Sequence, residues 1–293
     1  MTSRILLPLD GSDIAERALP YGEELAGKLE AELVLYHVHS REHQQQKNMF
    51  QVYLDSIAQS VRSRSGKGKN KVSTKIEAGE ATENICNLVS KSDIDLIVMT
   101  AVSGSGLKVG KLIGSVADHV CRSVPIPVML IRTDSRKQPE KNEQLFSKML
   151  VPLDGSELSK IALPIAEELA IRLKLQTTLF EMAAMVRLYD DGSGTADYGI
   201  LTQFNKLEKD RVTEELNKLQ ISLKEKGLDV ASSVISGFDA AYEIMEICKK
   251  KDIDLVVMST HGRTGLSRWV LGNVAEKILR HGETNLLLVH AAA

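Results

Sequence analysis

Short apolar runs alternate along this chain with longer segments in which apolar residues recur every three or four positions. The first half contains the runs ILLPL, ELVLYHV, KVSTKIE, DLIVM and PVMLI, and the second contains MLVPL, QTTLFEM, DVASSVIS, DLVVM and NLLLV. Such alternation is typical of βαβ units, whose strands form a parallel sheet. The pattern predicts two tandem, doubly wound α/β domains of the Rossmann-like kind, each a five-stranded parallel sheet flanked by helices.

The second half of the chain repeats the first. ILLPLDGSDIAERALPYGEELA returns as MLVPLDGSELSKIALPIAEELA, and DIDLIVMT returns later as DIDLVVMS. Because whole sets of elements recur in order, each copy is a complete fold and not one unit of a solenoid. The polar segment RKQPEKNEQLF separates the copies, so we expect a first domain over residues 1–135, a linker over 136–146 and a second domain over 147–293.

Serine residues mark the start of the first helix in both copies. Ser12 and Ser156 stand at N-cap positions, and an acid follows each of them, Asp13 or Glu157. A serine side chain can accept a bond from a first-turn amide, and an acid complements the positive end of the helix dipole. Both copies therefore predict a capped helix directly after the first strand.

Prolines also recur at matching positions. Pro20 and Pro164 predict that the first helix is kinked or restarts there. Pro8 and Pro152 lie inside the first predicted strands, although proline is normally excluded from central strands. Their presence in both copies indicates a structural purpose.

Composition excludes several classes of protein. The sequence is 43% hydrophobic and 26% charged, and its net charge of −2 lacks the positive field of a duplex-binding protein. No apolar run approaches the roughly 18 residues of a membrane span. The N-terminal MTSRILLPLDG has no signal-peptide pattern. We expect a cytoplasmic protein with no membrane partner. The overall charge disfavours a nucleic-acid partner, and a local basic patch stays open as a minor hypothesis.

The three cysteines, Cys86, Cys121 and Cys248, stand singly in segments with helical spacing. None belongs to a C-x-x-C pair, so small buried side chains are expected in place of a redox centre.

Candidate chemistry gathers where ligands bind in open α/β sheets, at the carboxyl ends of the strands. Asp10 and Asp154 follow the first strands. Glycine-containing loops follow the fourth strands, over residues 100–115 and 259–273, and lead into helices. A glycine loop that opens a helix presents amide groups and a positive dipole end to phosphate. An aspartate in a D-G-S turn equally serves the turn without any ligand.

Glycines are spaced alike in the two loops. Gly104 precedes Gly114, and Gly262 precedes Gly272, each pair being separated by nine residues. Ser115 adds a hydroxyl donor. Each loop also carries two cations, listed here: Lys108, Lys111, Arg263 and Arg268. These cations are interpreted either as phosphate ligands or as a solvated loop face.

With these residues the chain resembles the universal stress proteins of the tandem-domain type, whose fold is similar to that of the adenine-nucleotide α-hydrolases. The resemblance implies an ATP-binding module, with ADP or AMP as related ligands and often a divalent cation such as Mg²⁺. It implies that Asp10 and Asp154 bond the ribose or adenine and that Val38 and Met182 line the adenine pocket. The implied phosphate ligands are Gly104, Gly114, Ser115, Gly262, Gly272 and Asn273.

Both copies depart from the family signature G-x-x-G-x9-G-[ST]. Ala101 and Ser259 replace its leading glycine, and Asn273 replaces its hydroxyl residue in the second copy. Unequal affinities of the two sites are therefore expected. The resemblance also implies pairing of the domains through their last strands, PVMLIR and NLLLVH. A further homodimer stays open.

Other motifs point less clearly to chemistry. His37 and His39 alternate on one strand near His43, but a metal site needs further convergent ligands, so a structural role is expected and no metal site is assigned. The basic stretch 62–71 lacks the spacing of a phosphate loop, and the segment 190–199 is either a lid or a connection.

No catalytic constellation is evident in the sequence. The position after the first strand reads LDGSD or LDGSE, not the S-G-G-x-D-S loop of the related ATP pyrophosphatases. We therefore expect a stress-response binding module with at most weak ATP hydrolysis. The alternative is a nucleotide-independent scaffold in which one or both sites are vestigial.

Overall fold

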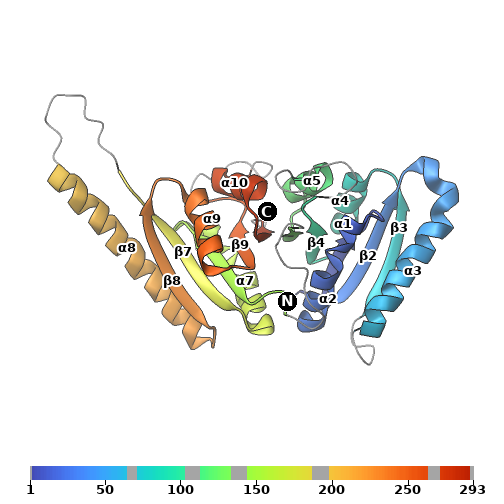
Figure 1. Ribbon diagram of the computed structural model, residues 1–293, viewed down its shortest axis with the longest axis horizontal. Coiled ribbons are helices and arrows are strands. Elements are labelled where there is room, and N and C mark those ends of the chain that lie inside the picture. The colour runs from blue at the N-terminus through green and yellow to red at the C-terminus, as the bar shows by residue number, and fades with distance from the viewer. Residues whose placement is uncertain are drawn as a thin grey trace.

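The computed structural model describes residues 2–64, 71–102, 113–132, 144–186, 198–262 and 271–290. They form two halves that lie side by side (Figure 1). The first half contains β1 (Arg4–Pro8), α1 (Asp13–Glu16), α2 (Leu19–Leu29), β2 (Glu32–His39), the 3-10 helix η1 (Arg41–Gln46), α3 (Lys47–Arg64), β3 (Val72–Ala78), α4 (Ala81–Lys91), β4 (Leu96–Thr100), α5 (Ser115–Ser123) and β5 (Val128–Ile131). The second contains β6 (Lys148–Leu153), α6 (Glu157–Lys160), α7 (Leu163–Leu173), β7 (Gln176–Ala184), α8 (Tyr198–Glu225), β8 (Val230–Gly237), α9 (Ala240–Lys251), β9 (Leu255–Ser259), α10 (Asn273–His281) and β10 (Asn285–Val289).

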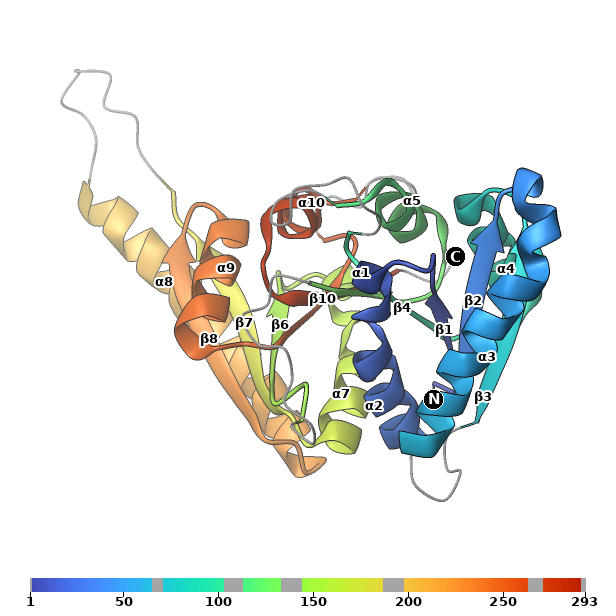
Figure 2. The ribbon, with the colours of Figure 1, turned by 45° about the vertical axis from the view of Figure 1, so that its right-hand side comes forward.

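The strands form one continuous sheet of ten, in the order β3-β2-β1-β4-β5-β10-β9-β6-β7-β8. Within each half all pairs are parallel, which confirms the predicted fold class. The halves meet where β5 pairs antiparallel with β10, with Met129 opposite Leu287. Figure 2 shows α3 and α8 at the two outer flanks of this sheet.

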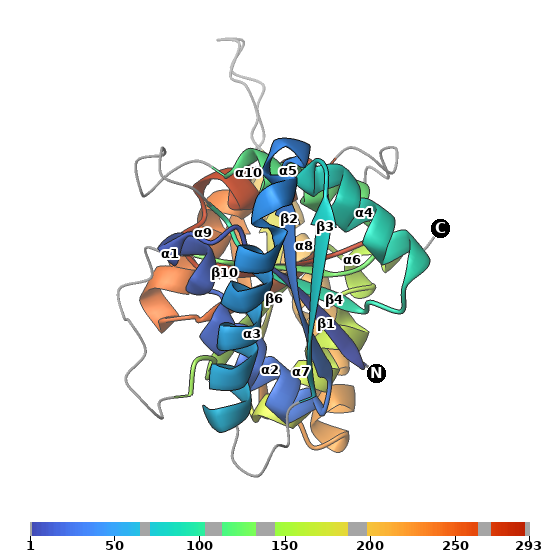
Figure 3. The same cartoon turned by 90° about the vertical axis from the view of Figure 1, so that its right-hand side faces the viewer.

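Alternation along the strands divides the core into two layers. Leu33 and Leu35 of β2 point into one buried cluster, and Val34 and Tyr36 point into the other. Successive strand residues face opposite sides of a sheet, so buried strands need apolar residues on both. Figure 3 looks toward the first half and shows α3 and α4 on opposite sides of the strands.

The helix starts expected from the serines are confirmed. Ser12 caps α1 by accepting a bond from the Ala15 amide, and Ser156 caps α6 in the same way. The expected effect of the prolines is also confirmed, because Pro20 and Pro164 lie in the first turns of the separate helices α2 and α7.

The position of Pro8 in β1 follows from the strand that it does not pair with, which is β4. β1 pairs with β2 along its whole length, from Arg4 to Pro8, but with β4 only at Ile5 and Leu6. The Leu9 amide donates to the Tyr36 carbonyl of β2, at 2.7 Å, so the position before it faces β4. Pro8 therefore stands where β1 and β4 have separated and no ladder bond is lost.

The cysteines match their expected role as structural side chains. Cys121 and Cys248 are buried and Cys86 is partly buried, all with free thiols. Burial raises the pKa of each thiol, which disfavours the reactive thiolate.

Among the helices in the described part of the chain, none is long and apolar enough to span a membrane.

Candidate functional site

Each half has a switch point at which the strand order reverses. β1 lies between β2 and β4, and β6 lies between β7 and β9. In the second half, as in the first, the contact with the fourth strand is short, because β6 pairs with β9 only at Met149 and Leu150. Both switch points therefore open toward the carboxyl ends of the strands, where ligands bind in sheets of this kind.

Asp10 and Asp154 follow these separated strands and hold tight turns. Oδ1 of Asp10 accepts bonds from the Ser12 amide at 2.9 Å and hydroxyl at 2.6 Å. The same oxygen of Asp154 accepts from Ser156 at 3.0 and 2.6 Å. Gly11 adopts a left-handed conformation between Asp10 and Ser12. Both aspartates therefore stabilise the turn that follows the first strand. Among the described residues both bonds of Asp10 end on Oδ1, and Oδ2 has no partner.

Glycines open the helices that follow the fourth strands. Gly114 is the N-cap of α5, and its amide donates to the Ala101 carbonyl at 2.8 Å. Gly272 is the N-cap of α10, and its amide donates to the Thr260 carbonyl at 2.8 Å. Neither N-cap supplies a side-chain bond to the first turn. Amides of a first turn have no acceptor within their helix, so both turns can donate to an anion.

The next residues, Ser115 and Asn273, are exposed at these helix starts. Their hydroxyl and amide groups stand beside the free first-turn amides. Each helix start is tied by its N-cap glycine to the end of the strand that borders the switch point. The structure thus places Gly114 and Ser115 in one cluster of the first half, and Gly272 and Asn273 in the matching cluster of the second.

In the second half the loop glycine presses against the aspartate. A Cβ atom on Gly262 would overlap Oδ2 of Asp154, so a larger residue there would have to push the carboxylate aside. Asp154 is partly buried, whereas Asp10 is exposed. Nearby, Nδ1 of His261 lies 2.9 Å from the Thr260 hydroxyl. Sequence reasoning missed the carbonyl anchors at Ala101 and Thr260.

Val38 and Met182 lie near the ends of β2 and β7, as the sequence predicted. Both are partly buried and pack against the core layer that faces α4, α5, α9 and α10. Other candidates fall outside the described residues: Gly104, Lys108, Lys111, Arg263, Arg268 and the stretch 190–197.

The strand histidines pack as a structural pair. His37 and His39 are both buried, and both rings contact the ring of Phe50, with centroids 4.4 and 5.6 Å away. Nδ1 of His37 lies 2.8 Å from the Leu9 carbonyl, while His43 contacts the Ser40 hydroxyl. Throughout the described ranges, no three His, Cys, Asp or Glu side chains are grouped to hold a metal ion.

Comparison with known proteins gives consistent matches. The sequence matches the universal stress protein family over residues 1–132 and 145–290. Universal stress protein MJ0531 of Methanocaldococcus jannaschii is 32% identical over 151 residues, which are 50% of this chain and 84% of that protein. A universal stress protein from Archaeoglobus fulgidus has a similar crystal structure, with a TM-score of 0.74, 18% identity and coverage of 99% of both chains.

One solved structure similar to half of the chain is a universal stress protein in complex with cAMP, at 22% identity and a TM-score of 0.35, over 45% of this chain and 98% of that one. The two family matches together span most of the sequence and follow its internal repeat. The chain therefore belongs to the universal stress protein family and carries the family's domain twice in tandem.

Proposed function

We propose that this protein binds an adenine nucleotide, ATP or its relatives ADP and AMP, at the switch point of at least one half. One observation carries the proposal. In both halves a glycine-capped helix start with free first-turn amides stands beside the opened switch point, which the turn aspartate also borders. The amides suit phosphate oxygens, and a carboxylate suits a ribose hydroxyl or an adenine amino group.

Different residues of the site would contact different parts of the nucleotide. Gly114 and Ser115, or Gly272 and Asn273, face the phosphates. Asp10 or Asp154 faces the sugar or base, and Val38 or Met182 offers an apolar wall. Mg²⁺ would be held through the phosphates, because the described residues contain no grouped metal ligands.

The nucleotide acts in this proposal as a signal and not as a substrate. Asp10 and Asp154 already hold turns through Oδ1, and the Thr260 hydroxyl, which contacts His261, is fully buried. Binding would order the glycine-capped edge and favour one state of the protein, which requires different affinities for the two states. A stress-response module in the cytoplasm, with weak hydrolysis at most, is the function we infer.

A nucleotide-independent scaffold is the second candidate. The observation that favours it is the pairing of β5 with β10, which joins the halves without any ligand. In that case the duplication exists to keep two domains paired, and one or both sites are vestigial.

Calorimetric titration of Mg-ATP into protein stripped of copurified nucleotide tests the proposal. Ser115→Glu and Asn273→Glu place a carboxylate at each exposed helix start, where it suits the helix dipole but repels phosphate. Wild type should bind, and at least one of the two variants should lose a class of site. His119→Glu, at an exposed position further along α5, is the control for an added carboxylate and should retain binding. Absence of binding to wild type would overturn the proposal in favour of the scaffold.

A further inference from the structure

Each half ends in a strand followed by a basic side chain that reaches into the other half. Arg132 follows β5, and His290 follows β10. The two occupy equivalent positions in the repeat, at the ends of PVMLIR and NLLLVH. Because β5 and β10 pair antiparallel, each residue is delivered to the opposite half.

Arg132 caps a helix of the second half. Its Nη2 atom donates to the carbonyl oxygens of Leu279 at 2.6 Å and Ile278 at 3.2 Å. Its backbone amide donates to Oδ1 of Asn285 at 2.9 Å. Leu279 lies in the last turn of α10, where carbonyls lack a donor from within the helix, whereas the Ile278 carbonyl also accepts from the Gly282 amide at 2.8 Å. A guanidinium there satisfies these oxygens and opposes the negative dipole end.

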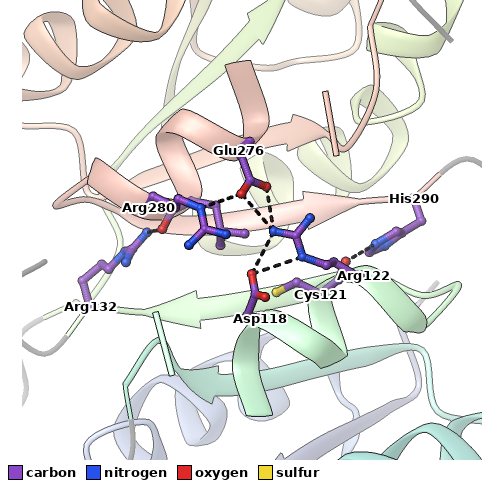
Figure 4. A network of polar contacts seen from close by, with 8 residues as sticks. Asp118, Cys121, Arg122, Arg132, Glu276, Arg280 and His290 are labelled. Carbon is purple, nitrogen blue, oxygen red and sulfur yellow. Dashed lines mark hydrogen bonds and ion pairs between the residues drawn. The ribbon is translucent and has the colours of Figure 1, made fainter. Parts of the chain in front are cut away.

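His290 makes the reciprocal contact with the first half. Its Nε2 lies 2.7 Å from the carbonyl oxygen of Cys121, in the last turn of α5. Its Nδ1 lies 3.1 Å from the carbonyl oxygen of Ile126, just before β5. Figure 4 shows Arg132 and His290 at opposite ends of the contact network between the halves.

The two helices are also joined directly. Arg122 of α5 contacts Asp118 of its own helix at 2.9 Å and Glu276 of α10 at 2.7 Å. Arg280 of α10 contacts the same Glu276 at 2.6 Å. Glu276 therefore bridges arginines from both halves, and α5 and α10 lie adjacent in Figures 1 and 2.

These are the helices whose other ends form the candidate sites. α5 and α10 have nine residues each, so only about 13 Å separates their ends. Helices this short depend on tertiary contacts for their stability and position. A contact that holds the C-terminal turn therefore also fixes the N-terminal turn that faces the ligand.

We propose that Arg132 is a positioning residue for the candidate site of the second half, and His290 for that of the first, so that the two sites are coupled. The coupling between nucleotide sites rests on the proposed function, whereas the crossed positioning of the helices does not. Occupation of one site would then change the affinity of the other, and the effect would be reciprocal.

Hydrogen exchange of the nucleotide-free protein tests the crossed positioning. Arg132→Met should speed amide exchange in α10 by about tenfold, because the buried Leu279 carbonyl loses its donor, and leave α5 within about twofold. His290→Leu should do the reverse. Arg132→Lys should restore part of the protection, and Arg280→Gln, which removes a contact within α10's own half, is the control for a lost surface charge. The proposal would be overturned if the exchange rate changed only in the helix of the half that carries the substitution, α5 for Arg132 and α10 for His290. Equal changes in both helices would also overturn it.

Titration with Mg-ATP tests both the effect of Arg132 on affinity and the coupling. Coupling predicts that each site binds with a different affinity in wild type, beside an occupied partner site, than when the other site is removed by Ser115→Glu or Asn273→Glu, and equal affinities would rule it out. In the Ser115→Glu background only the second site remains, and Arg132→Met should weaken its affinity by at least about fivefold. In the Asn273→Glu background the same change should leave the first site within about twofold. Equal weakening in both backgrounds would contradict the crossed assignment. If neither background binds ATP, the proposed function fails, and the exchange measurement still decides whether each helix is held by the opposite half.

Discussion

His37 is a buried base on the strand that borders the first switch point. Its Nδ1 faces the Leu9 carbonyl, and its Nε2 is buried without a hydrogen-bond partner among the described residues. Burial lowers the pKa of His37, against the opposing effect of the bond to Leu9. The folded protein therefore holds this ring neutral, while the unfolded chain protonates it near its ordinary pKa of about 6.5.

The pH dependence of stability should reveal this difference. Above about pH 6.5 the unfolded chain binds no extra proton at His37. As the pH is lowered below that value, the free energy of unfolding should decrease by up to about 1.4 kcal/mol per pH unit for this residue. His37→Asn should flatten part of that slope in urea melts between about pH 7.5 and 5.5. His290 has the same direction of pKa shift, so some slope remains. His119→Asn, at an exposed position, is the control, and equal slopes in both variants would contradict the prediction.

Gly262 tests how tightly the second site is built. Alanine there should force Asp154 away from its two bonds with Ser156 and cost about 1–3 kcal/mol of unfolding free energy. Gly272→Ala is the matched control, because its Cβ would meet the Thr260 carbonyl oxygen at a tolerable 3.4 Å. Chemical denaturation measures both. In an Asp154→Ala background the cost of Gly262→Ala should largely vanish, and an undiminished cost would place the strain elsewhere.

At the scale of elements, local signals made the prediction possible. Strand alternation, the serine caps at Ser12 and Ser156 and the prolines at Pro20 and Pro164 act within a few residues, so the sequence displays them directly. The aspartates and N-cap glycines of the site were predictable for the same reason, since each adjoins a recognisable strand or helix end. Their ligand stays a prediction.

Long-range contacts were not predictable in this way. Pro8 looked misplaced until the separation of β1 from β4 was known. Arg132 and His290 follow strands like any surface residue, and only the antiparallel register of β5 with β10 shows that they reach across. The anchoring of Gly114 by Ala101 and of Gly272 by Thr260 likewise depends on folded geometry.

The whole molecule has a single sheet and a core layer shared by both halves. One buried cluster runs from residues of the first half to residues of the second, and the Tyr21 and Phe146 rings meet across the junction with centroids 5.3 Å apart. Because the two halves share this core, we expect them to unfold together as one cooperative unit. Differential scanning calorimetry should therefore give one transition whose calorimetric and van't Hoff enthalpies agree. Two resolved transitions would show that the halves unfold independently.

The β5–β10 junction has a consequence for how such a protein responds to its amount in the cell. If the two domains were separate chains, the edge strands β5 and β10 would be covered only when two chains associate. Here both edges are covered within one polypeptide. Dilution cannot part them, because their effective concentration is set by the connection and not by expression. A signal read from the paired form would therefore track the occupancy of the sites, and would be insensitive to whether the cell holds many copies of the chain or few.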